Sequence, residues 1–333
     1  MSETRREDAR REKILSVVVP CHNEVETLPY THQRLLDSVR QLPYDSVEIL
    51  YVNDGSGDGT GTVLTGLHAR HLREPGHVVV TVLEFSRNFG HSSAVLAGLT
   101  HARGQSIAII DADLQDPPEI LGAMLRDLDS GQWDVVYGQR QYREQENAFK
   151  KVTAWTFYRL LNLMTGFEIP RDAGDFRVIT SQVRDAILRC RETDLFIRGI
   201  VAWVGFRQKA FPYVREARKY GHTKYGLRKM IRFASLAILS FSSKPLRLGI
   251  YLGFLGLALT LGILVWGLVA WSRGSTVPGW ASLLGAFLCG QSFILMLLGV
   301  IGTYIGRIYT ESQGRPRFIL RDERSHPRLL EKA

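Results

Sequence analysis

Four oxygen-bearing side chains follow a short apolar run at residues 106–110. They are Asp111, Asp113, Gln115 and Asp116. Such side chains, two positions apart, can reach one hard divalent cation, which is usually shared with the phosphates of a substrate. The alternative is an ordinary acidic turn, in which Asp116 caps a helix that begins at Pro117. The motif alone leaves both interpretations open.

Elements that could position these residues recur along residues 14–138. Apolar, β-branched runs lie at residues 14–19, 47–52, 77–85, 106–110 and 134–137, and helical patterns lie at residues 27–42, 59–72, 92–103 and 119–130. Apolar strands separated by helices predict right-handed crossovers and a parallel sheet covered on both faces. Four polar segments would then meet at the carboxyl edge of the sheet, where open α/β sheets bind ligands. These segments are residues 20–24, 53–60, 86–91 and 111–116.

The charge and composition of the chain restrict the classes of partner that it can bind. The chain has 333 residues, enough for one large or two ordinary domains, and a net charge of +9. Residues 205–247 contain eleven Lys or Arg against the single acid Glu216, which indicates phosphate, nucleic acid or an anionic membrane surface as partner. The three cysteines lack metal-ligand spacing, which favours a reducing compartment. The apolar run after residue 13 is too short for a signal peptide, so we expect the first domain in the cytosol.

Two uncharged segments, residues 248–271 and 280–304, are each long enough to span a bilayer. Lys and Arg flank the pair on its outer sides, so the positive-inside rule predicts an inner-membrane protein with two spans and both termini cytoplasmic. Residues 224–241 have the pattern of a basic amphipathic helix, either in the membrane interface or packed on the domain. An apolar helix at residues 148–165 would be buried or face lipid. The spans contain no acid or base, which argues against a transporter or channel.

Most familiar motifs are absent. Gly55 and Gly57 do not complete a dinucleotide fingerprint, because Thr60 occupies the position of the third glycine. His68 and His71 share a predicted helix face that we interpret as exposed surface. The remaining polar set at the sheet edge suits a nucleotide diphosphate bound through a cation, and the basic segment suits a lipid phosphate. The residues thus predict transfer from a nucleotide-activated donor to a lipid phosphate.

Six motifs, in order, resemble the polyprenyl-phosphate glycosyltransferases of glycosyltransferase family 2, which include the dolichyl-phosphate mannose and glucose synthases. The motifs are Pro20-x-x-Asn-Glu, Val52-Asn-Asp-Gly-Ser-x-Asp-x-Thr60, Ser86-Arg-Asn-Phe-Gly-His91, Asp111-Ala-Asp-Leu-Gln-Asp-Pro-Pro-Glu119, Gly174-Asp-Phe-Arg177 and Arg215-x-x-Arg-Lys-x-Gly-x-Thr-Lys-Tyr225. The resemblance implies an α/β GT-A domain with a Rossmann-like, mostly parallel sheet. It also implies inverting transfer of one sugar to undecaprenyl or dolichyl phosphate. UDP-glucose is the favoured donor, and UDP-linked modified sugars or GDP-mannose are the alternatives.

The same resemblance assigns roles to residues. Pro20, Asn23, Glu24, Asp54, Arg87 and Asp111 would bind the nucleotide sugar; Asp113 and Gln115 would bind Mg²⁺ or Mn²⁺; Arg140 and Asp175 would act near the donor phosphates and the sugar; and Arg215, Arg218, Lys219 and Lys224 would bind the acceptor phosphate. A lipid phosphate is already largely ionised near neutral pH. We therefore expect Asp175 to orient substrate more than to remove a proton. For the basic residues the alternative is simple membrane anchoring.

The expected organisation has four parts: a GT-A domain at residues 1–213, basic juxtamembrane helices at 214–247, a two-helix transmembrane hairpin within 248–306, and a cytoplasmic tail at 307–333. Glycine pairs in both spans would allow close helix packing or a homo-oligomer. A non-catalytic membrane scaffold is the rival from another class, and the complete acidic set argues against it. Nucleic-acid binding would place the positive charge on the soluble sheet instead of beside the spans, so we expect no nucleic-acid partner.

Overall fold

The computed structural model describes residues 12–73, 76–141, 173–192, 196–215, 244–274 and 279–324. The helices expected at residues 148–165 and 224–241, and the predicted phosphate ligands Arg218, Lys219 and Lys224, lie outside these residues. Two compact units make up the chain. The first comprises Met1–Arg159, Phe167–Gly226 and Pro316–Ala333, and the second comprises Leu160–Gly166 and Leu227–Arg315. The described residues 316–324, which follow the long helices, thus belong with the first unit.

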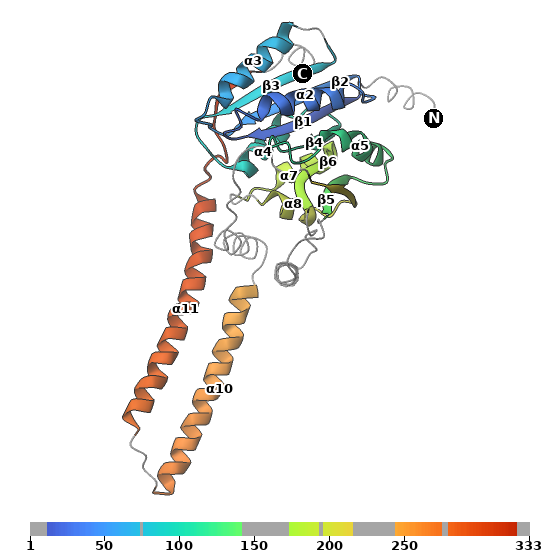
Figure 1. Cartoon of the computed structure of the whole chain (residues 1–333). Coiled ribbons are helices and arrows are strands. Elements are labelled where there is room, and N and C mark those ends of the chain that lie inside the picture. Colours follow the sequence, from blue (N-terminus) through green and yellow to red (C-terminus); the bar gives the residue numbers. More distant parts are fainter. Residues whose placement is uncertain are drawn as a thin grey trace. The chain divides into compact units, whose positions relative to one another are not determined.

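The first unit is built on an eight-stranded sheet in the order β7-β5-β6-β4-β1-β2-β3-β8 (Figure 1). The strands are β1 (Ile14–Cys21), β2 (Ser46–Asn53), β3 (Val78–Phe85), β4 (Ser106–Ile109), β5 (Val135–Gln141), β6 (Ala173–Thr180), β7 (Gln208–Val214) and β8 (Leu320–Arg324). Strands β4, β1, β2 and β3 are parallel. Strand β6 is antiparallel to β4 and β5, and β8 is antiparallel to β3. The central sheet is therefore parallel, as predicted, and becomes mixed toward both edges.

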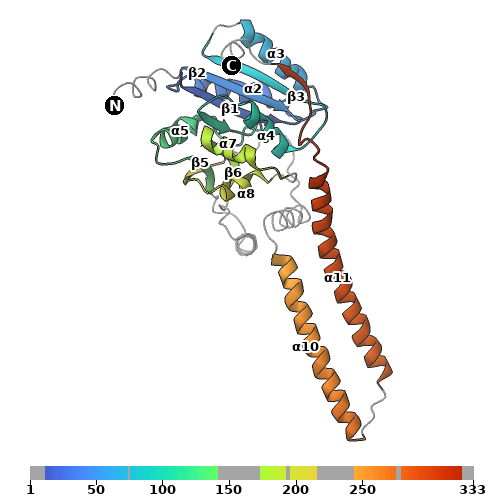
Figure 2. The same ribbon diagram turned by 180° about the vertical axis from the view of Figure 1, so that it is seen from behind.

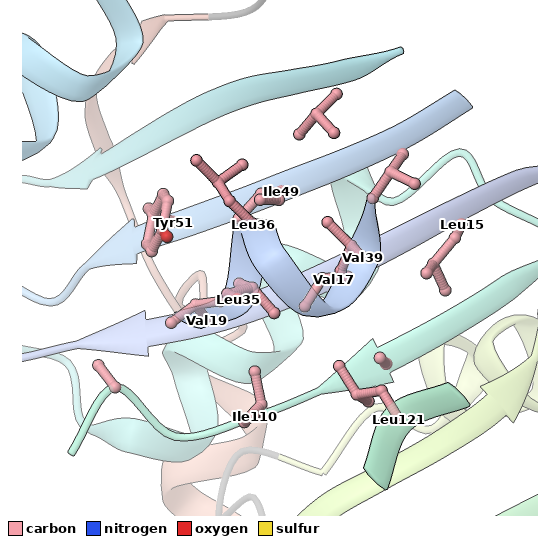
Figure 3. Close-up of a cluster of buried hydrophobic side chains, with 14 of the residues drawn as sticks. Leu15, Val17, Val19, Leu35, Leu36, Val39, Ile49, Tyr51, Ile110 and Leu121 are labelled. Carbon is pink, nitrogen blue, oxygen red and sulfur yellow. The ribbon is translucent and has the colours of Figure 1, made fainter. Parts of the chain in front are cut away.

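Helices cover both faces of this sheet, as the strand pattern predicts. They are α2 (Leu28–Val39), α3 (Thr60–Arg73), α4 (His91–His101), the 3-10 turn η2 (Pro118–Ile120), α5 (Leu121–Asp129), α7 (Ser181–Arg189) and α8 (Ile197–Trp203). Alternate side chains of β1 and β2 pack against α2, α3 and α5, and Figure 3 shows Leu35 and Val39 of α2 lying over these strands. Helices α4 and α7 lie on the other face (Figure 2).

Local sequence patterns were sufficient to predict the strands and helices of residues 14–138. All five strands and all four helical segments predicted within residues 14–138 are present, with ends displaced by a few residues. The motif Gly174-Asp-Phe-Arg177 lies in β6. Strand β7 was not predicted because it lies within the basic segment and lacks a continuous apolar run. Strand β8 was not predicted either, because residues 307–333 were expected only as a tail.

The interpretation of His68 and His71 as exposed surface was wrong, because α3 turns this face onto the sheet. Both are buried, and His68 Nδ1 lies 2.8 Å from the Val80 carbonyl oxygen. His71 Nε2 lies 3.2 Å from Nε2 of buried His32, whose Nδ1 is 2.9 Å from the Tyr51 hydroxyl. Burial, with smaller contributions from the charges of His71, Arg70 and Arg40, lowers the pKa of His32 to about 4.

This depressed pKa predicts a loss of stability in mild acid. The unfolded chain takes up a proton at His32 below about pH 6.5, whereas the folded chain does so only near pH 4. The free energy of unfolding should therefore fall as pH drops from 6.5 to 4, by up to about 3 kcal/mol. Urea unfolding at several pH values should show that His32→Gln flattens this slope. An identical slope in the variant and the parent would contradict the assignment.

Helix α4 packs unusually close to β1 at Gly98. A Cβ at this position would lie 2.2 Å from Val18 Cγ1, and Val18 is fully buried. We predict that Gly98→Ala destabilises the protein by about 1–3 kcal/mol, because overpacking a stiff β-branched neighbour outweighs the better helix propensity of alanine. Gly66→Ala in α3 is the matched control, since nothing lies within 4 Å of its Cβ. The control should stabilise by roughly 0.5–1 kcal/mol in thermal or urea unfolding.

The second unit contains two long helices, α10 (Lys244–Ser272) and α11 (Trp280–Ser312). They pack through Gly249, where a Cβ would lie 2.1 Å from Leu297 Cδ1. Within the described residues, one segment, Gly290–Ser312, is long and apolar enough to cross a membrane, with a mean hydropathy of 1.6. In α10 the apolar stretch Gly253–Gly267 is shorter. Both helices expose large apolar side chains, as expected of a surface that contacts lipid.

Candidate active site

Polar segments that follow the parallel strands lie together at one edge of the sheet, as the sequence predicted. The Asn23 side chain accepts a hydrogen bond from Gly57 N at 3.0 Å, and its own backbone N donates to Ser56 Oγ at 3.0 Å. Thr31 of α2 donates to the Ala112 carbonyl at 2.8 Å, which ties the acidic turn after β4 to the segment after β1. Parallel strands end at the same edge, so residues distant in sequence meet there.

Carboxylates converge after β4. Burial raises the pKa of Asp111 to about 6; the charge of His91 lowers it, whereas those of Asp175, Asp116 and Asp113 raise it. Leu114 has a φ of +61°, a conformation that costs a branched residue about 1 kcal/mol, and Asp113 Oδ1 accepts a hydrogen bond from Gln115 N at 3.1 Å. A strained turn that concentrates like charges is suited to a cationic ligand.

Asp116 does not cap a helix, so the helix-cap alternative is wrong for this residue. The residue before η2 is Pro117, which makes no side-chain cap, and Asp116 is 1% exposed. Its Oδ1 accepts a short hydrogen bond from the Tyr213 hydroxyl, and Arg215 Nε lies 3.5 Å away. Both partners come from the end of β7, which the sequence did not reveal as a strand. Asp116 is therefore part of the acidic cluster.

Two predicted arginines border this cluster. Arg215, which was expected to bind the acceptor phosphate, has its NH2 group 3.9 Å from Asp113 Oδ2. Arg140 donates from Nε to the Tyr213 hydroxyl at 3.4 Å. Gly174 allows Arg140 to approach, since a Cβ there would lie 2.8 Å from the guanidinium. Two cationic side chains thus lie beside the carboxylates, in a position to neutralise bound phosphate.

Asp175, at the start of β6, is surrounded by cationic groups. Arg198 of α8 forms two hydrogen bonds with it, at 2.9 and 2.8 Å, and His91 Nε2 lies 3.3 Å from Oδ2. The buried Arg177 guanidinium is 3.6 Å from Oδ1. Burial alone raises the pKa of Asp175, but the hydrogen bonds and charges of Arg198 and His91 outweigh it and keep the pKa well below 3.8. The carboxylate is therefore ionised and fully engaged.

Asp54 organises the loop that follows β3. Its carboxylate accepts hydrogen bonds from Phe89 N at 2.7 Å and from Gly90 N at 3.0 Å, and the Asn88 side chain donates to it at 3.0 Å. A Cβ on Gly55 would lie 2.4 Å from the Arg87 carbonyl carbon, so the two loops touch backbone to backbone. That Asp54 also contacts the nucleotide stays a prediction.

The other predicted nucleotide ligands occupy the same edge. Pro20 is buried at the end of β1, and the side chain of Glu24 accepts from Thr27 Oγ1 at 2.5 Å. Arg87 lies 4.2 Å above the Phe89 ring. Four of the five nucleotide-binding candidates other than Asp111 thus lie on three adjacent loops, and Pro20 lies at the end of β1 beside them. Their contacts with a nucleotide stay predictions.

The residues present fit a divalent cation that is shared with substrate. Among the described residues, no group of three or more His, Cys, Asp or Glu side chains could enclose a metal ion by itself. A cation bound mainly by phosphates and water needs only one or two protein carboxylates. Asp113 and the half-buried Gln115 offer oxygen ligands, and Asp111 Oδ1 and Asp116 Oδ2 are buried without a hydrogen-bond partner. Such buried acceptors fit a site completed by a cationic ligand.

His91, Arg198 and Tyr213 belong to this network but were not among the predicted site residues. His91 had a signal, since it ends the polar segment after β3. Arg198 and Tyr213 had none, because each enters the site from a separate element late in the chain. Only the tertiary structure brings α8 and β7 to the carboxylates.

Residues 16–188 match the family model described as Glycosyl transferase family 2. The chain belongs to this family. It is 44% identical over 308 residues to the uncharacterized glycosyltransferase YkcC of Bacillus subtilis, covering 92% of each chain. It is 36% identical over 311 residues to the bactoprenol glucosyl transferase of Shigella phage SfV, covering 93% of this chain and 99% of the relative.

A solved mannosyltransferase from Pyrobaculum calidifontis, in complex with GDP-Man and Mn²⁺, is also similar to this glycosyltransferase. The TM-score is 0.48 at 18% identity, covering 91% of this chain and 86% of that one. Family membership shows that the chain is a glycosyltransferase. The α/β architecture with a parallel central sheet, which the sequence predicted, is confirmed by the structure.

The hydrogen bond from Tyr213 to Asp116 provides a test of the acidic cluster. Tyr213→Phe leaves a buried carboxylate without its donor, so we predict a loss of about 1–3 kcal/mol in unfolding free energy. Because Arg140 loses the same hydroxyl, we also expect glycosyl transfer to fall at least tenfold, by order of magnitude. Tyr44→Phe is the control, since its hydroxyl donates to Asp129 at 3.3 Å, outside the cluster. Equal activity of both variants would contradict this account.

Proposed function

We propose that this glycosyltransferase moves one sugar from a nucleotide sugar to a polyprenyl phosphate at the cytoplasmic face of the membrane. The decisive observation is the end-to-end similarity to a bactoprenol glucosyl transferase, which includes the C-terminal apolar segments. The geometry supports it, because the acidic turn after β4 lies beside Arg140 and Arg215. A site of this composition suits two phosphorylated substrates whose charges must be neutralised together.

The donor is proposed to be UDP-glucose, with UDP-linked modified sugars or GDP-mannose as alternatives. Pro20, Asn23, Glu24, Asp54 and Arg87 would line the nucleotide pocket, and Asp111 would face the donor. Asp113 and Gln115 would bind Mg²⁺ or Mn²⁺, which when bound would neutralise the diphosphate leaving group. Arg140 would bind the donor phosphates.

The acceptor phosphate is proposed to attack the anomeric carbon directly, which inverts its configuration. A phosphate monoester is already largely ionised near neutral pH, so the reaction needs no strong general base. The contacts of Asp175 agree with this view, because both of its oxygens are engaged by Arg198 and one also by His91. Asp175 would thus orient these two cationic side chains toward the phosphates.

The acceptor would bind to Arg215, together with Arg218, Lys219 and Lys224 beyond the described residues. Undecaprenyl phosphate and dolichyl phosphate both fit this chemistry. We further propose that α10 and α11 form a two-span hairpin with both chain ends cytoplasmic. The segment Gly290–Ser312 supports one span, and the positive residues outside the pair support the orientation. A homo-oligomer is compatible with the glycine pairs of these helices.

The test is a transfer assay with membranes that contain the full chain, a polyprenyl phosphate and a panel of labelled nucleotide sugars. We expect label from one donor, UDP-glucose first, to enter the lipid phase only when Mg²⁺ or Mn²⁺ is present. Asp113→Asn should lower the rate at least a hundredfold, by order of magnitude. Asp127→Asn is the matched control, because Asp127 pairs at 2.8 Å with Lys209 near the opposite end of β7. Label that stays in the aqueous phase with every donor would refute the proposal.

A further inference from the structure

The last strand of the chain closes the β3 edge of the sheet. In Figures 1 and 2, β8 lies beside β3, and the two pair antiparallel from Val82 opposite Arg324 to Phe85 opposite Leu320. One further backbone hydrogen bond, from Ser86 N to the Ile319 carbonyl at 3.0 Å, extends the contact past the end of β3. The C-terminal segment therefore reaches the loop of residues 86–90, which the proposed function assigns to the donor site.

Aromatic rings continue this contact into the loop. Phe318 stacks on Phe85, with ring centroids 5.4 Å apart and planes at 10°. Phe85 in turn meets Phe89 edge to face, at 5.6 Å and 88°. The Arg87 guanidinium lies 4.2 Å above the Phe89 ring. Phe85 is 2% exposed, so the ring at the centre of this series has little freedom to move.

Phe89 is also connected to the catalytic groups through its backbone. Its N–H donates to Asp54 at 2.7 Å, and helix α4 begins two residues later at His91, whose ring approaches Asp175 and Asp111. A shift of the Phe89 ring would therefore change both the Asp54 loop and the start of α4. Stacked and edge-to-face pairs each contribute only about 0.5–1.5 kcal/mol, but here they fix one loop conformation.

We propose that β8 positions the donor site, with Phe318 acting through Phe85 and Phe89 to keep the loop of residues 86–90 in its nucleotide-binding conformation. This inference rests on the proposed function of that loop. Residues 313–319 connect α11 directly to β8, so the segment that completes the donor site is the one that emerges from the long apolar helix. The alternative role is only to cover an edge strand, which would protect against edge-to-edge association.

The test compares Phe318→Ala with Ile319→Ala in the full chain. Both remove apolar area from the same segment, but Ile319 is 50% exposed and has no ring to stack on Phe85. We expect Phe318→Ala to weaken binding of UDP with Mg²⁺, and to raise KM for the donor, by about three- to tenfold. The KM for polyprenyl phosphate should stay within about twofold, and kcat at saturating donor should change less than the donor KM, because Phe89 contacts the donor loop directly and reaches His91 only through the start of α4.

Phe318→Tyr should restore donor affinity, because it keeps the ring, whereas Phe318→Leu should not. If Phe318→Ala does not fold, the Leu and Tyr pair supplies the same comparison. Unchanged UDP affinity in Phe318→Ala or Phe318→Leu, with only stability reduced, would overturn the inference and leave the edge-covering role. Equal effects of the Phe318 and Ile319 variants would also overturn it. A parent protein that binds neither UDP nor GDP would instead refute the proposed function itself, and this inference with it.

Discussion

The structure of the catalytic unit depends on balancing buried negative charge. Asp111, Asp113, Asp116 and Asp175 meet in a small volume, where like charges raise the pKa of Asp111. Arg198 and His91 neutralise Asp175, while Arg215 and Tyr213 meet Asp116. Removing one partner from such a network leaves an uncompensated charge in low dielectric, which costs more than a surface ion pair contributes. The elements that bring these partners, α8, α4 and β7, are thereby constrained together.

The carboxylates of the site differ in how fully they are hydrogen-bonded. Asp175 is fully paired, whereas Asp111 Oδ1 and Asp116 Oδ2 are buried and make no hydrogen bond among the described residues. A fully engaged carboxylate orients its neighbours, and a buried carboxylate oxygen without a hydrogen bond is suited to meet a cationic ligand. This division agrees with the proposed transfer, in which Asp113 and Gln115 would hold a divalent cation and the acceptor phosphate would displace the nucleoside diphosphate. The four aspartates of the site thus have different roles, although they are the same type of residue.

Close backbone approaches allow this convergence. Gly55 lets the loop after β2 touch the loop after β3, and Gly98 lets α4 lie directly on Val18 of β1. Because α4 begins at His91, its distance from the sheet also fixes how near that imidazole comes to Asp175. The strand β8 adds a third constraint on the same loop, from the opposite end of the sequence. Close packing at a few glycines thus determines the positions of charged side chains elsewhere in the site.

The sequence by itself determined the central fold and most of one sheet edge. Apolar runs alternating with helical patterns specify parallel strands, and these strands bring the segments of Asn23, Asp54, Arg87 and Asp111 together by topology alone. Such signals are local, so they can be read without coordinates. The long apolar segments and the family motifs are local signals of the same kind.

Only the tertiary structure decided the remaining partners. Tyr213 lies in the edge strand β7, Phe318 comes just before the edge strand β8, and Arg198 lies in helix α8. No periodicity in these segments specifies which part of the sheet or of the site they meet. Asp116 is a further case. Its position before Pro117 is typical of a helix cap, but the end of β7 brings Tyr213 and Arg215 against its carboxylate. The same holds for His68 and His71, which are polar in type yet buried because α3 packs that face on the sheet. Long-range pairing selects among locally equivalent conformations, and that selection is not encoded in any one segment.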